Sequence, residues 1–197
     1  MLKGGYFTDV RSAIHHVSFS VGSIITTTGY GTVDFSLWPE FSKGILLVLM
    51  IIGGCAGSTS GGMKVSRVMI LIKSARSGVR HMLHPHSVEV MTMDGKRVDR
   101  DVIDGSFAFL AVYVLIAVFS MVLLSLDNLG AETSVSAVMA TLNNIGPGVS
   151  SLVGPYGSFS VFSDLSKLVM IADMLFGRLE LFPMIMLLRP ATWRKHG

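Results

Sequence analysis

The chain has 197 residues, of which 50% are hydrophobic and only 15% are charged, and its mean hydropathy is +0.60. In a soluble domain about a quarter of the residues are usually charged, so this composition favours a membrane protein. The single cysteine, Cys55, excludes an internal disulfide and a cysteine-based metal cluster.

The first predicted element covers residues 9–23, which are moderately hydrophobic but too short and too polar to cross a bilayer. This pattern predicts a re-entrant helix. It leads into ITTTGYGTVD at residues 25–34, where three threonines precede Gly-Tyr-Gly. The apolar residues 44–52 follow, then the run GGCAGSTSGG at 53–62, then the amphipathic residues 63–76. We interpret these last three segments as one helix that is broken in its middle.

Residues 107–126 are the clearest predicted transmembrane helix, because these twenty residues carry no charge and span ~30 Å as a helix. A second short segment of moderate hydrophobicity begins at residue 132 and leads into TLNNIGPGV at residues 141–149. Residues 165–188 are a further candidate span, with four charged residues inside it: Lys167, Asp173, Arg178 and Glu180.

Basic residues gather on one side of these segments. Many lie between residues 64 and 100 or after the last span, whereas residues 127–164 contain no lysine or arginine. The positive-inside rule therefore predicts that residues 64–103 and the C-terminus are cytoplasmic, and that the loops at 27–43 and 127–163 are external. Because membrane topology explains the basic charge, we expect no nucleic acid partner. No spanning helix precedes the first loop, so we expect the chain to be the C-terminal part of a longer protein.

Two stretches of the chain match each other at a shift of 117 residues. The shift places Gly29 on Gly146, and two threonines of the first stretch fall on Asn143 and Asn144. Internal repeats are a building rule of membrane transport proteins. We therefore predict a repeated unit of outer helix, re-entrant helix, glycine-containing loop and inner helix, of which the first copy lacks its outer helix.

The two glycine loops are predicted to bind a dehydrated cation. Glycine lets successive carbonyls point into one narrow channel, and such carbonyls replace the hydration shell of potassium in the TVGYG filters of potassium channels. The TTTGYG of the first loop is close to that pattern, and the NNIGPG of the second is a looser version. A glycine-rich external turn is the alternative reading of one such loop. The predicted filter residues are Thr27, Thr28, Gly29, Tyr30, Asn144, Ile145, Gly146 and Pro147, with K⁺ at Thr28, Gly29, Ile145 and Gly146.

The chain resembles the Trk/Ktr/HKT superfamily of potassium transporters, and within it the bacterial TrkH-type membrane subunit. The segments that carry the resemblance are TTTGYGT at 26–32, GGCAGSTSGGMKVSR at 53–67, NNIGPG at 143–148 and MLFGRLELFP at 174–183. The resemblance implies an all-α membrane protein with four potassium-channel-like repeats of helix, re-entrant pore helix, filter loop and helix. Residues 1–103 match the third repeat without its first helix, with a broken inner helix and a cytoplasmic linker. Residues 104–197 match the fourth repeat with a C-terminal tail.

The resemblance also implies a cellular location, an oligomeric state and partner proteins for the chain. It implies a multi-pass protein of the bacterial inner membrane, in contact with lipid, which takes up potassium and forms a homodimer. It implies cytoplasmic nucleotide-binding regulatory (TrkA-like) subunits, and the N-terminal half of the same transporter as a partner. The basic residues 64–100 are the expected contact surface for the regulator. No cofactor besides the transported K⁺ is expected, and no nucleophile–base pairing indicates an enzyme.

By the same resemblance, the small-residue run is an intramembrane gate beneath the filter, and Arg178 projects a positive charge into the pore. The adjacent glycine pairs favour an unwound segment, because each glycine costs a helix up to ~1 kcal/mol relative to alanine; a close-packed helix face is the alternative. For Arg178 the alternative is a structural ion pair with Asp173 or Glu180. The gate residues are Gly53, Gly54, Gly57, Ser58, Thr59, Ser60, Gly61 and Gly62.

Two rival functions remain open. One is a related transporter that conducts Na⁺, and the other is a truncated, non-conducting chain that only assembles with a partner. The remaining reactive residues are assigned minor roles: Cys55 to packing, and His15 and His16 to packing or the external surface. Three further histidines, His81, His84 and His86, lie close together in the sequence, and a metal site there is the less favoured interpretation.

Overall fold

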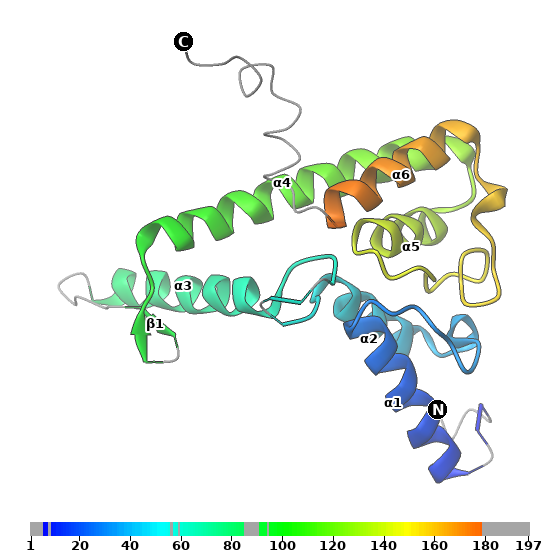
Figure 1. The fold of residues 1–197 in the computed structure, drawn as a ribbon, viewed down its shortest axis with the longest axis horizontal. Coiled ribbons are helices and arrows are strands. Elements are labelled where there is room, and N and C mark those ends of the chain that lie inside the picture. The colour runs from blue at the N-terminus through cyan, green and yellow to red at the C-terminus, as the bar shows by residue number, and fades with distance from the viewer. Residues whose placement is uncertain are drawn as a thin grey trace.

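The structure is a computed structural model that describes residues 6–7, 9–55, 57–58, 60–84, 91–93 and 95–178. The described part is mostly helical and its only strands form one two-residue hairpin, which confirms the predicted all-α class (Figure 1). Its elements in chain order are α1 (Val10–Ile25), η2 (Phe35–Leu37), α2 (Glu40–Ile51), α3 (Val65–Leu83), β1 (Thr92–Met93), β2 (Lys96–Arg97), α4 (Arg100–Leu124), η3 (Ser125–Asp127), α5 (Ala131–Leu142), η4 (Phe159–Val161) and α6 (Asp164–Arg178).

Helix α1 corresponds to the first predicted re-entrant helix. Its 16 residues span ~24 Å, less than the ~30 Å of a hydrocarbon core. The helix ends where Thr27 and Gly29 take positive φ angles of 54° and 80°, which an α-helix of L-residues cannot contain. The chain then returns through η2 to α2, where Pro39 precedes the first helical residue and Glu40 places a negative charge in the first turn. Helices α1 and α2 pack against each other and, with η2, form the first unit.

The predicted break in the inner helix is confirmed, since α2 ends at Ile51 and α3 begins at Val65. Backbone hydrogen bonds tie the two ends of the intervening loop together. Gly53 N donates to Met63 O at 2.8 Å, Met63 N donates to Ile51 O at 3.2 Å, and Val65 N donates to Gly54 O at 3.2 Å. The loop therefore leaves the helical path and returns to it at nearly the same place.

Helices α3 and α4 run beside each other and are both longer than the sequence patterns indicate (Figure 1). Helix α4 begins at Arg100, seven residues before the predicted start at residue 107, because its first two turns are polar and hydropathy misses them. A two-residue hairpin that the sequence analysis did not predict lies between the helices and pairs Thr92 with Arg97. An Asp-Gly dipeptide at residues 94–95, the usual signal of a tight hairpin turn, marks it in the sequence.

Helices α4, α5 and α6 form the second unit. Helix α5 is the second predicted re-entrant helix, and its 12 residues span ~18 Å. It packs against both α4 and α6, so the three helices surround one core. The structure describes α6 as far as Arg178, and the rest of the predicted span, residues 179–188, lies outside the described residues.

Two apolar clusters hold the fold together. One lies among α4, α5 and α6 around residues such as Leu124, Val138 and Leu142. The other lies among α1, η2 and α2, and it includes Ile145 and Val149 of the second predicted filter loop. The second loop therefore belongs to the core of the first unit, which fixes the two units against each other.

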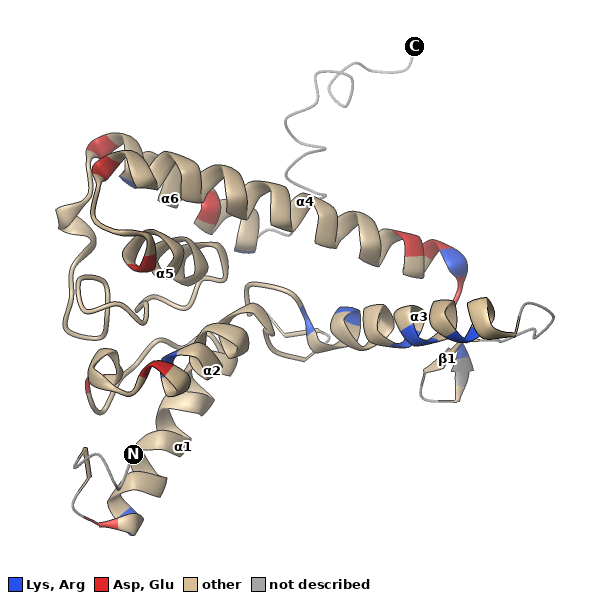
Figure 2. Ribbon diagram, turned by 180° about the vertical axis from the view of Figure 1, so that it is seen from behind, with Lys and Arg blue, Asp and Glu red and all other residues tan. Residues whose placement is uncertain are grey.

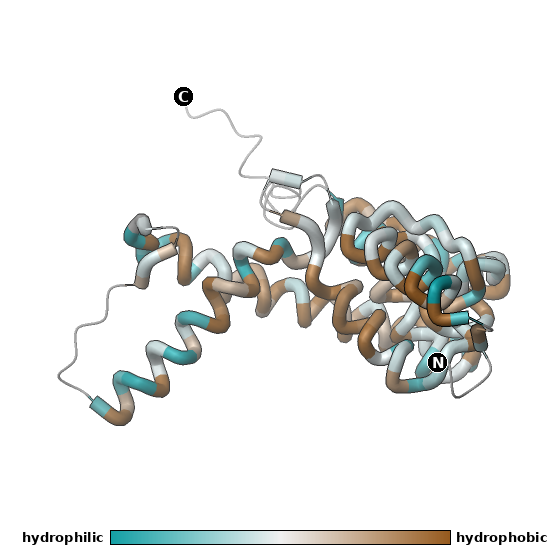
Figure 3. Tube along the Cα trace, turned by 90° about the horizontal axis from the view of Figure 1, so that it is seen from below, coloured by the Kyte–Doolittle hydropathy of each residue, from teal (hydrophilic) through white to brown (hydrophobic). Residues whose placement is uncertain are grey.

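The segment Arg100–Asp127 is, within the described residues, the one helical segment long and apolar enough to cross a membrane. Only 28% of its most apolar window is buried inside the structure, and Leu115, Phe119 and Val122 point outward, as contact with lipid requires. Lys and Arg residues gather along α3 and near the hairpin (Figure 2). Polar and apolar residues alternate along α3, which is therefore amphipathic (Figure 3).

Candidate ion-conduction site

The two predicted filter loops have the same backbone, at the predicted shift of 117 residues. Thr27 and Asn144 both have φ of 54°, and the glycines two residues later, Gly29 and Gly146, have φ of 80° and 107°. The helix-ending hydrogen bonds also correspond: Thr28 N donates to Ser23 O at 2.9 Å, and Ile145 N donates to Ala140 O at 2.9 Å. A β-branched residue with positive φ is an uncommon and strained feature that concentrates at functional sites.

The side chain at the start of each loop donates an equivalent hydrogen bond, from a hydroxyl in one loop and from an amide in the other. Thr26 Oγ1 donates to Gly22 O at 2.7 Å, and Asn143 Nδ2 donates to Met139 O at 2.8 Å. Each bond joins a residue at the end of a re-entrant helix to the carbonyl four residues earlier. The alignment of hydroxyl residues with asparagines, inferred from sequence, therefore corresponds to a shared structural role at Thr26 and Asn143.

The two loops also touch each other. A Cβ atom added at Gly29 would collide with the carbonyl oxygen of Ile145 and lie 3.2 Å from Pro147 Cδ. Both loops line one open cavity of about 510 Å³, whose walls include Thr27, Thr28, Asn144, Ile145 and Gly146 together with residues of α6. Their burial differs, because Tyr30 is 73% exposed whereas Ile145 is 3% exposed.

The predicted gate loop lies against the base of the second filter loop. A Cβ at Gly61 would collide with the carbonyl oxygen of Asn143, and a Cβ at Gly62, where φ is 76°, would collide with Asn143 Oδ1. Within the loop, Gly54 N donates to Ser60 Oγ at 2.9 Å and Ser60 N donates to Ser58 Oγ at 3.2 Å. The remaining predicted gate positions are Gly53, which faces the Gly61 carbonyl, Gly57, which has φ of 85°, and Thr59, which lies outside the described residues.

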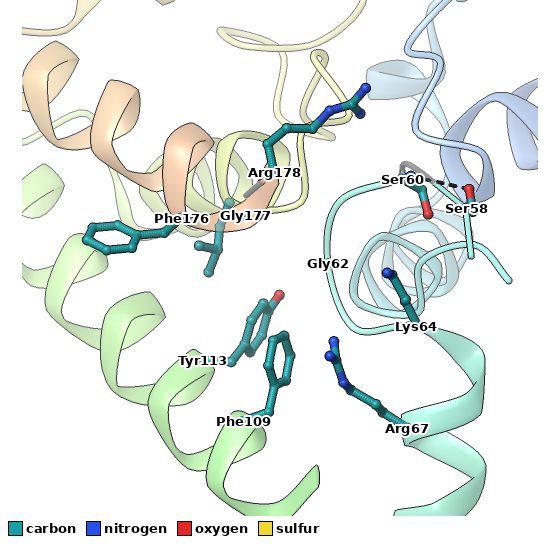
Figure 4. A pocket seen from close by; sticks show the side chains of 11 residues that line it. Ser58, Ser60, Gly62, Lys64, Arg67, Phe109, Tyr113, Phe176, Gly177 and Arg178 are labelled. Atoms are coloured by element: carbon teal, nitrogen blue, oxygen red, sulfur yellow. Dashed lines mark hydrogen bonds between the residues drawn. The ribbon is translucent and has the colours of Figure 1, made fainter. Parts of the chain in front are cut away.

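Arg178 ends the described part of α6 and lies near the contact between the gate loop and the second filter loop. A Cβ at its neighbour Gly177 would collide with the carbonyl oxygen of Leu142, so this turn of α6 lies against the base of the second loop. Arg178 is exposed and lines a small cavity of about 40 Å³ together with Lys64 and Arg67 (Figure 4). This cavity therefore lies between the end of α6 and the start of α3, and the Arg178 guanidinium points away from Lys64 and Arg67 (Figure 4).

The alternative reading of Arg178, an ion pair with Asp173, is not formed in the structure. Asp173 is 2% exposed, and its Oδ1 accepts a hydrogen bond of 2.7 Å from Ser120 Oγ on α4. No carboxylate among the described residues forms an ion pair with Arg178. Glu180, the other partner in that alternative, lies outside the described residues.

Three polar contacts near the loops were not predicted from the sequence. Ser136 Oγ accepts hydrogen bonds from Val149 N at 2.6 Å and Ser150 N at 3.1 Å, inside the core. Tyr113 on α4 donates to Asn143 Oδ1 at 3.0 Å. Lys43 on α2 contacts Glu132 on α5 at 2.9 Å and Glu40 at 2.8 Å, which joins the two units. Except for Lys43 and Glu40, which are three residues apart on α2, the partners are at least 13 residues apart in the chain, so only the fold reveals these contacts.

The minor residues have the following positions. Cys55 is exposed, so its predicted packing role is not fulfilled within the described residues. His16 Nδ1 lies 2.9 Å from Thr32 Oγ1, just after the first loop, and its ring stacks on Phe7 at 5.8 Å. His86 lies outside the described residues, among which no group of three His, Cys, Asp or Glu residues is arranged to hold a metal ion.

Comparisons with known proteins agree with this architecture. Residues 6–195 match the family model TrkH, described as a cation transport protein. The chain is 38% identical over 98% of its length to the Trk system potassium uptake protein TrkH of Vibrio parahaemolyticus. It is 32% identical over 96% of its length to the protein of the same name from Escherichia coli, and 34% identical over 95% to TrkI of Halomonas elongata.

A solved structure has the same fold. The crystal structure of the potassium transporter TrkH from Vibrio parahaemolyticus matches 98% of the chain with a TM-score of 0.85 and 37% sequence identity. The chain spans 41% of that structure and 38–39% of the three curated relatives. Since the family model covers nearly all of its residues, the chain belongs to the TrkH family of cation transport proteins.

Proposed function

We propose that the chain forms half of a potassium uptake transporter in the bacterial inner membrane. It supplies the third and fourth of four filter loops, and potassium exchanges its hydration water for backbone carbonyls of residues 27–30 and 144–147. The first two loops come from an N-terminal half. The transported K⁺ is the only bound species that this function requires.

One observation carries the proposal: two loops with the same unusual backbone meet and open on one cavity. Irregular backbone at membrane depth is tolerated only where it is buried in protein or lines water. Filters made of carbonyl rings need several loops around one axis. Two adjacent loops of matching conformation, Thr27–Gly29 contacting Ile145–Pro147, supply half of such a ring.

The relatives' names supply the ion. They are potassium uptake proteins, and the chain carries nearly two fifths of their length. We therefore propose potassium as the substrate, a homodimer as the assembly, and a TrkA-like nucleotide-binding subunit as the cytoplasmic partner. The basic, amphipathic helix α3 offers that partner a charged surface.

We also assign control of the flux to residues 53–62 and Arg178. The loop is closed at its base and rests on Asn143, directly beside the second filter loop. A cation that leaves the filter on this side would meet the loop and the positive charge of Arg178. Both features oppose its passage, one by volume and the other by repulsion.

The test is uptake by the assembled transporter, meaning this chain joined to the part of the Vibrio relative that precedes the matched region. That part is expected to supply the first two repeats and the outer helix of the third. In a bacterium that lacks its own potassium uptake systems, we expect growth at low potassium and Rb⁺ uptake that excess Na⁺ barely inhibits. Uptake of Na⁺ in place of Rb⁺ would assign the chain to a sodium-conducting relative. A dimer that forms in the membrane but transports neither ion would make it an assembly subunit.

Two variants test the flux control. Deleting residues 57–60 shortens the loop, and Arg178→Ala removes the charge, so each is expected to raise the initial rate of Rb⁺ entry into liposomes. Arg11→Ala is a control, because Arg11 is an exposed basic residue near the start of α1 and is not among the residues that line either cavity. A folded variant with an unchanged or lower rate would contradict the role assigned to the altered segment.

A further inference from the structure

Asn143 is the point where three parts of the proposed pathway meet. It is 0% exposed and comes directly before the filter residue Asn144. Its side-chain nitrogen caps α5 by donating to Met139 O at 2.8 Å. Its side-chain oxygen accepts a hydrogen bond of 3.0 Å from Tyr113 Oη on the outer helix α4. The position of this side chain is therefore set from two sides.

The gate loop uses the same residue as its support. Gly61 and Gly62 approach Asn143 so closely that neither position has room for a Cβ atom, and the contact at Gly62 is with the oxygen that Tyr113 binds. A shift of the Asn143 side chain would therefore move the loop or open a gap beneath it. The same shift would alter the start of the second filter loop, because Asn143 and Asn144 are consecutive residues.

Two stacked aromatic rings and a guanidinium connect Tyr113 to the start of α3. Phe109 lies one turn earlier on α4, and its ring stacks on the Tyr113 ring at a centroid distance of 6.3 Å. The guanidinium of Arg67 lies 4.2 Å from the centroid of the Phe109 ring. Figure 4 shows these three side chains in line on one side of the small cavity, with Gly62 across from them. Tyr113 is 4% exposed, and its hydrogen bond to Asn143 is buried.

We propose that Tyr113 is a positioning residue for permeation: its hydroxyl fixes Asn143, and through Asn143 it sets the spacing between the gate loop and the second filter loop. This inference rests on the proposed function. Tyr113 contributes no group to the filter, so its influence on selectivity depends on Asn143. Removal of the hydroxyl leaves a buried acceptor without its donor, and the Asn143 side chain is then held by its single bond to Met139.

The experiment compares two hydroxyl deletions on one helix in the assembled transporter. Tyr113→Phe removes the hydrogen bond to Asn143. The matched control, Ser120→Ala, removes a buried hydroxyl two turns along α4, whose bond of 2.7 Å goes to Asp173 on α6. The measurements are the rate of Rb⁺ uptake, the Na⁺ concentration that halves it, and the melting temperature. We expect Tyr113→Phe to change the Na⁺ inhibition roughly threefold to tenfold, as loss of one buried hydrogen bond implies.

A purely structural role for Tyr113 makes a different prediction. Both variants would then lower the melting temperature and leave Na⁺ inhibition unchanged, and this result would overturn the proposal. A double-mutant cycle provides the second check. In an Asn143→Ala background, Tyr113→Phe should have no further effect on Na⁺ inhibition, and an undiminished effect there would show that Tyr113 acts by another route.

Failure of the proposed function has its own signature. If the unmodified assembled transporter takes up no Rb⁺, the function itself is refuted and the inference falls with it. If that transporter is selective and Tyr113→Phe matches it in both Na⁺ inhibition and rate, the function stands and only the positioning role is refuted.

Discussion

The two filter loops share a backbone but differ in what holds them. The loop after α5 is supported by buried polar contacts: Ser136 accepts from two backbone N–H groups, and Thr133 binds Ser150 at 2.9 Å. At the shift of 117 residues, the loop after α1 has Phe19 in place of Ser136 and His16 in place of Thr133. Phe19 is 42% exposed and makes no equivalent bond. The first loop therefore lacks these two buried supports, and we infer that its contact with the second loop at Gly29 contributes more to its position.

This difference teaches that conformation and support are encoded separately. The positive φ angles at Thr27 and Gly29 recur at Asn144 and Gly146, so the two loops share this feature of their backbone. Apart from the shared contact made by Thr26 and Asn143, the supporting side chains differ between the two loops without changing these φ angles. The comparison predicts that the second loop is the rigid half of the pair and that the first follows it.

The largest expected difference is between alanine substitutions at the two equivalent glycines of the filter loops, Gly29 and Gly146. Gly29→Ala places a Cβ against the Ile145 carbonyl in addition to the strain of positive φ, whereas Gly146→Ala adds the strain with no described atom within 4 Å. Strain costs about 1–2 kcal/mol and overpacking about 1–3 kcal/mol more. We expect Gly29→Ala to lose more K⁺ selectivity and thermal stability than Gly146→Ala, measured as Na⁺ inhibition of Rb⁺ uptake and as melting temperature. Equal losses would mean that the loops do not depend on their mutual contact.

The sequence predicts the parts of this comparison that depend on local pattern. Hydropathy and length predict the long helix α4 and the short helices α1 and α5, because apolar periodicity and segment length are local properties. The 117-residue shift pairs Gly29 with Gly146, and the structure confirms that both have positive φ. Adjacent glycines likewise predict the break between α2 and α3 correctly.

The sequence does not predict the supports, because these join distant residues. Nothing near Ser136 indicates that its hydroxyl meets Val149 N, and nothing near Tyr113 indicates Asn143 as its partner. The start of α4 was missed for another reason, since its first turns carry charge and extend beyond the apolar span. Local pattern therefore predicts which segments are helices, and only the packed fold shows which side chains hold the loops.

The second prediction tests the rigid loop directly. Ser136→Ala leaves the buried Val149 and Ser150 N–H groups without their acceptor, which costs about 1–3 kcal/mol. We expect a lower melting temperature and weaker discrimination of K⁺ over Na⁺ in the assembled transporter. Phe19→Ala, at the equivalent position of the first repeat, is the control and should leave the discrimination unchanged. A larger effect from Phe19→Ala would reverse the assignment of the rigid loop.

The third prediction concerns the ion pair that joins the units. Lys43 is 8% exposed and bridges Glu40 and Glu132, so Lys43→Met keeps the packing and removes the link between α2 and α5. Because Glu132 is more than half exposed, the expected loss is modest, about 1 kcal/mol. Glu132→Gln should reproduce most of this loss, whereas Glu40→Gln, which breaks only a contact within α2, should not. Similar losses from the two glutamine variants would show that the contact between units is not the important one.

The smallest expected effect comes from the side-chain support of the first loop. Thr32→Val preserves the shape of the residue and removes the exposed hydrogen bond of 2.9 Å to His16. Since water replaces an exposed partner, the cost should be a few tenths of a kcal/mol, near the lower limit for hydrogen bonds. The matched change in the second loop, Ser150→Ala, leaves the buried Thr133 hydroxyl without its partner and should cost about 1–3 kcal/mol.

Together, Thr32→Val and Ser150→Ala decide whether the first loop depends on the second. If it does, Thr32→Val should leave both Rb⁺ uptake and Na⁺ inhibition within error of the unmodified transporter, while Ser150→Ala shifts both. A clear change in Na⁺ inhibition from Thr32→Val would mean that His16 holds the first loop in place. The contact between Gly29 and Ile145 would then be a consequence of two independently fixed loops, and the unequal glycine effects would need another cause.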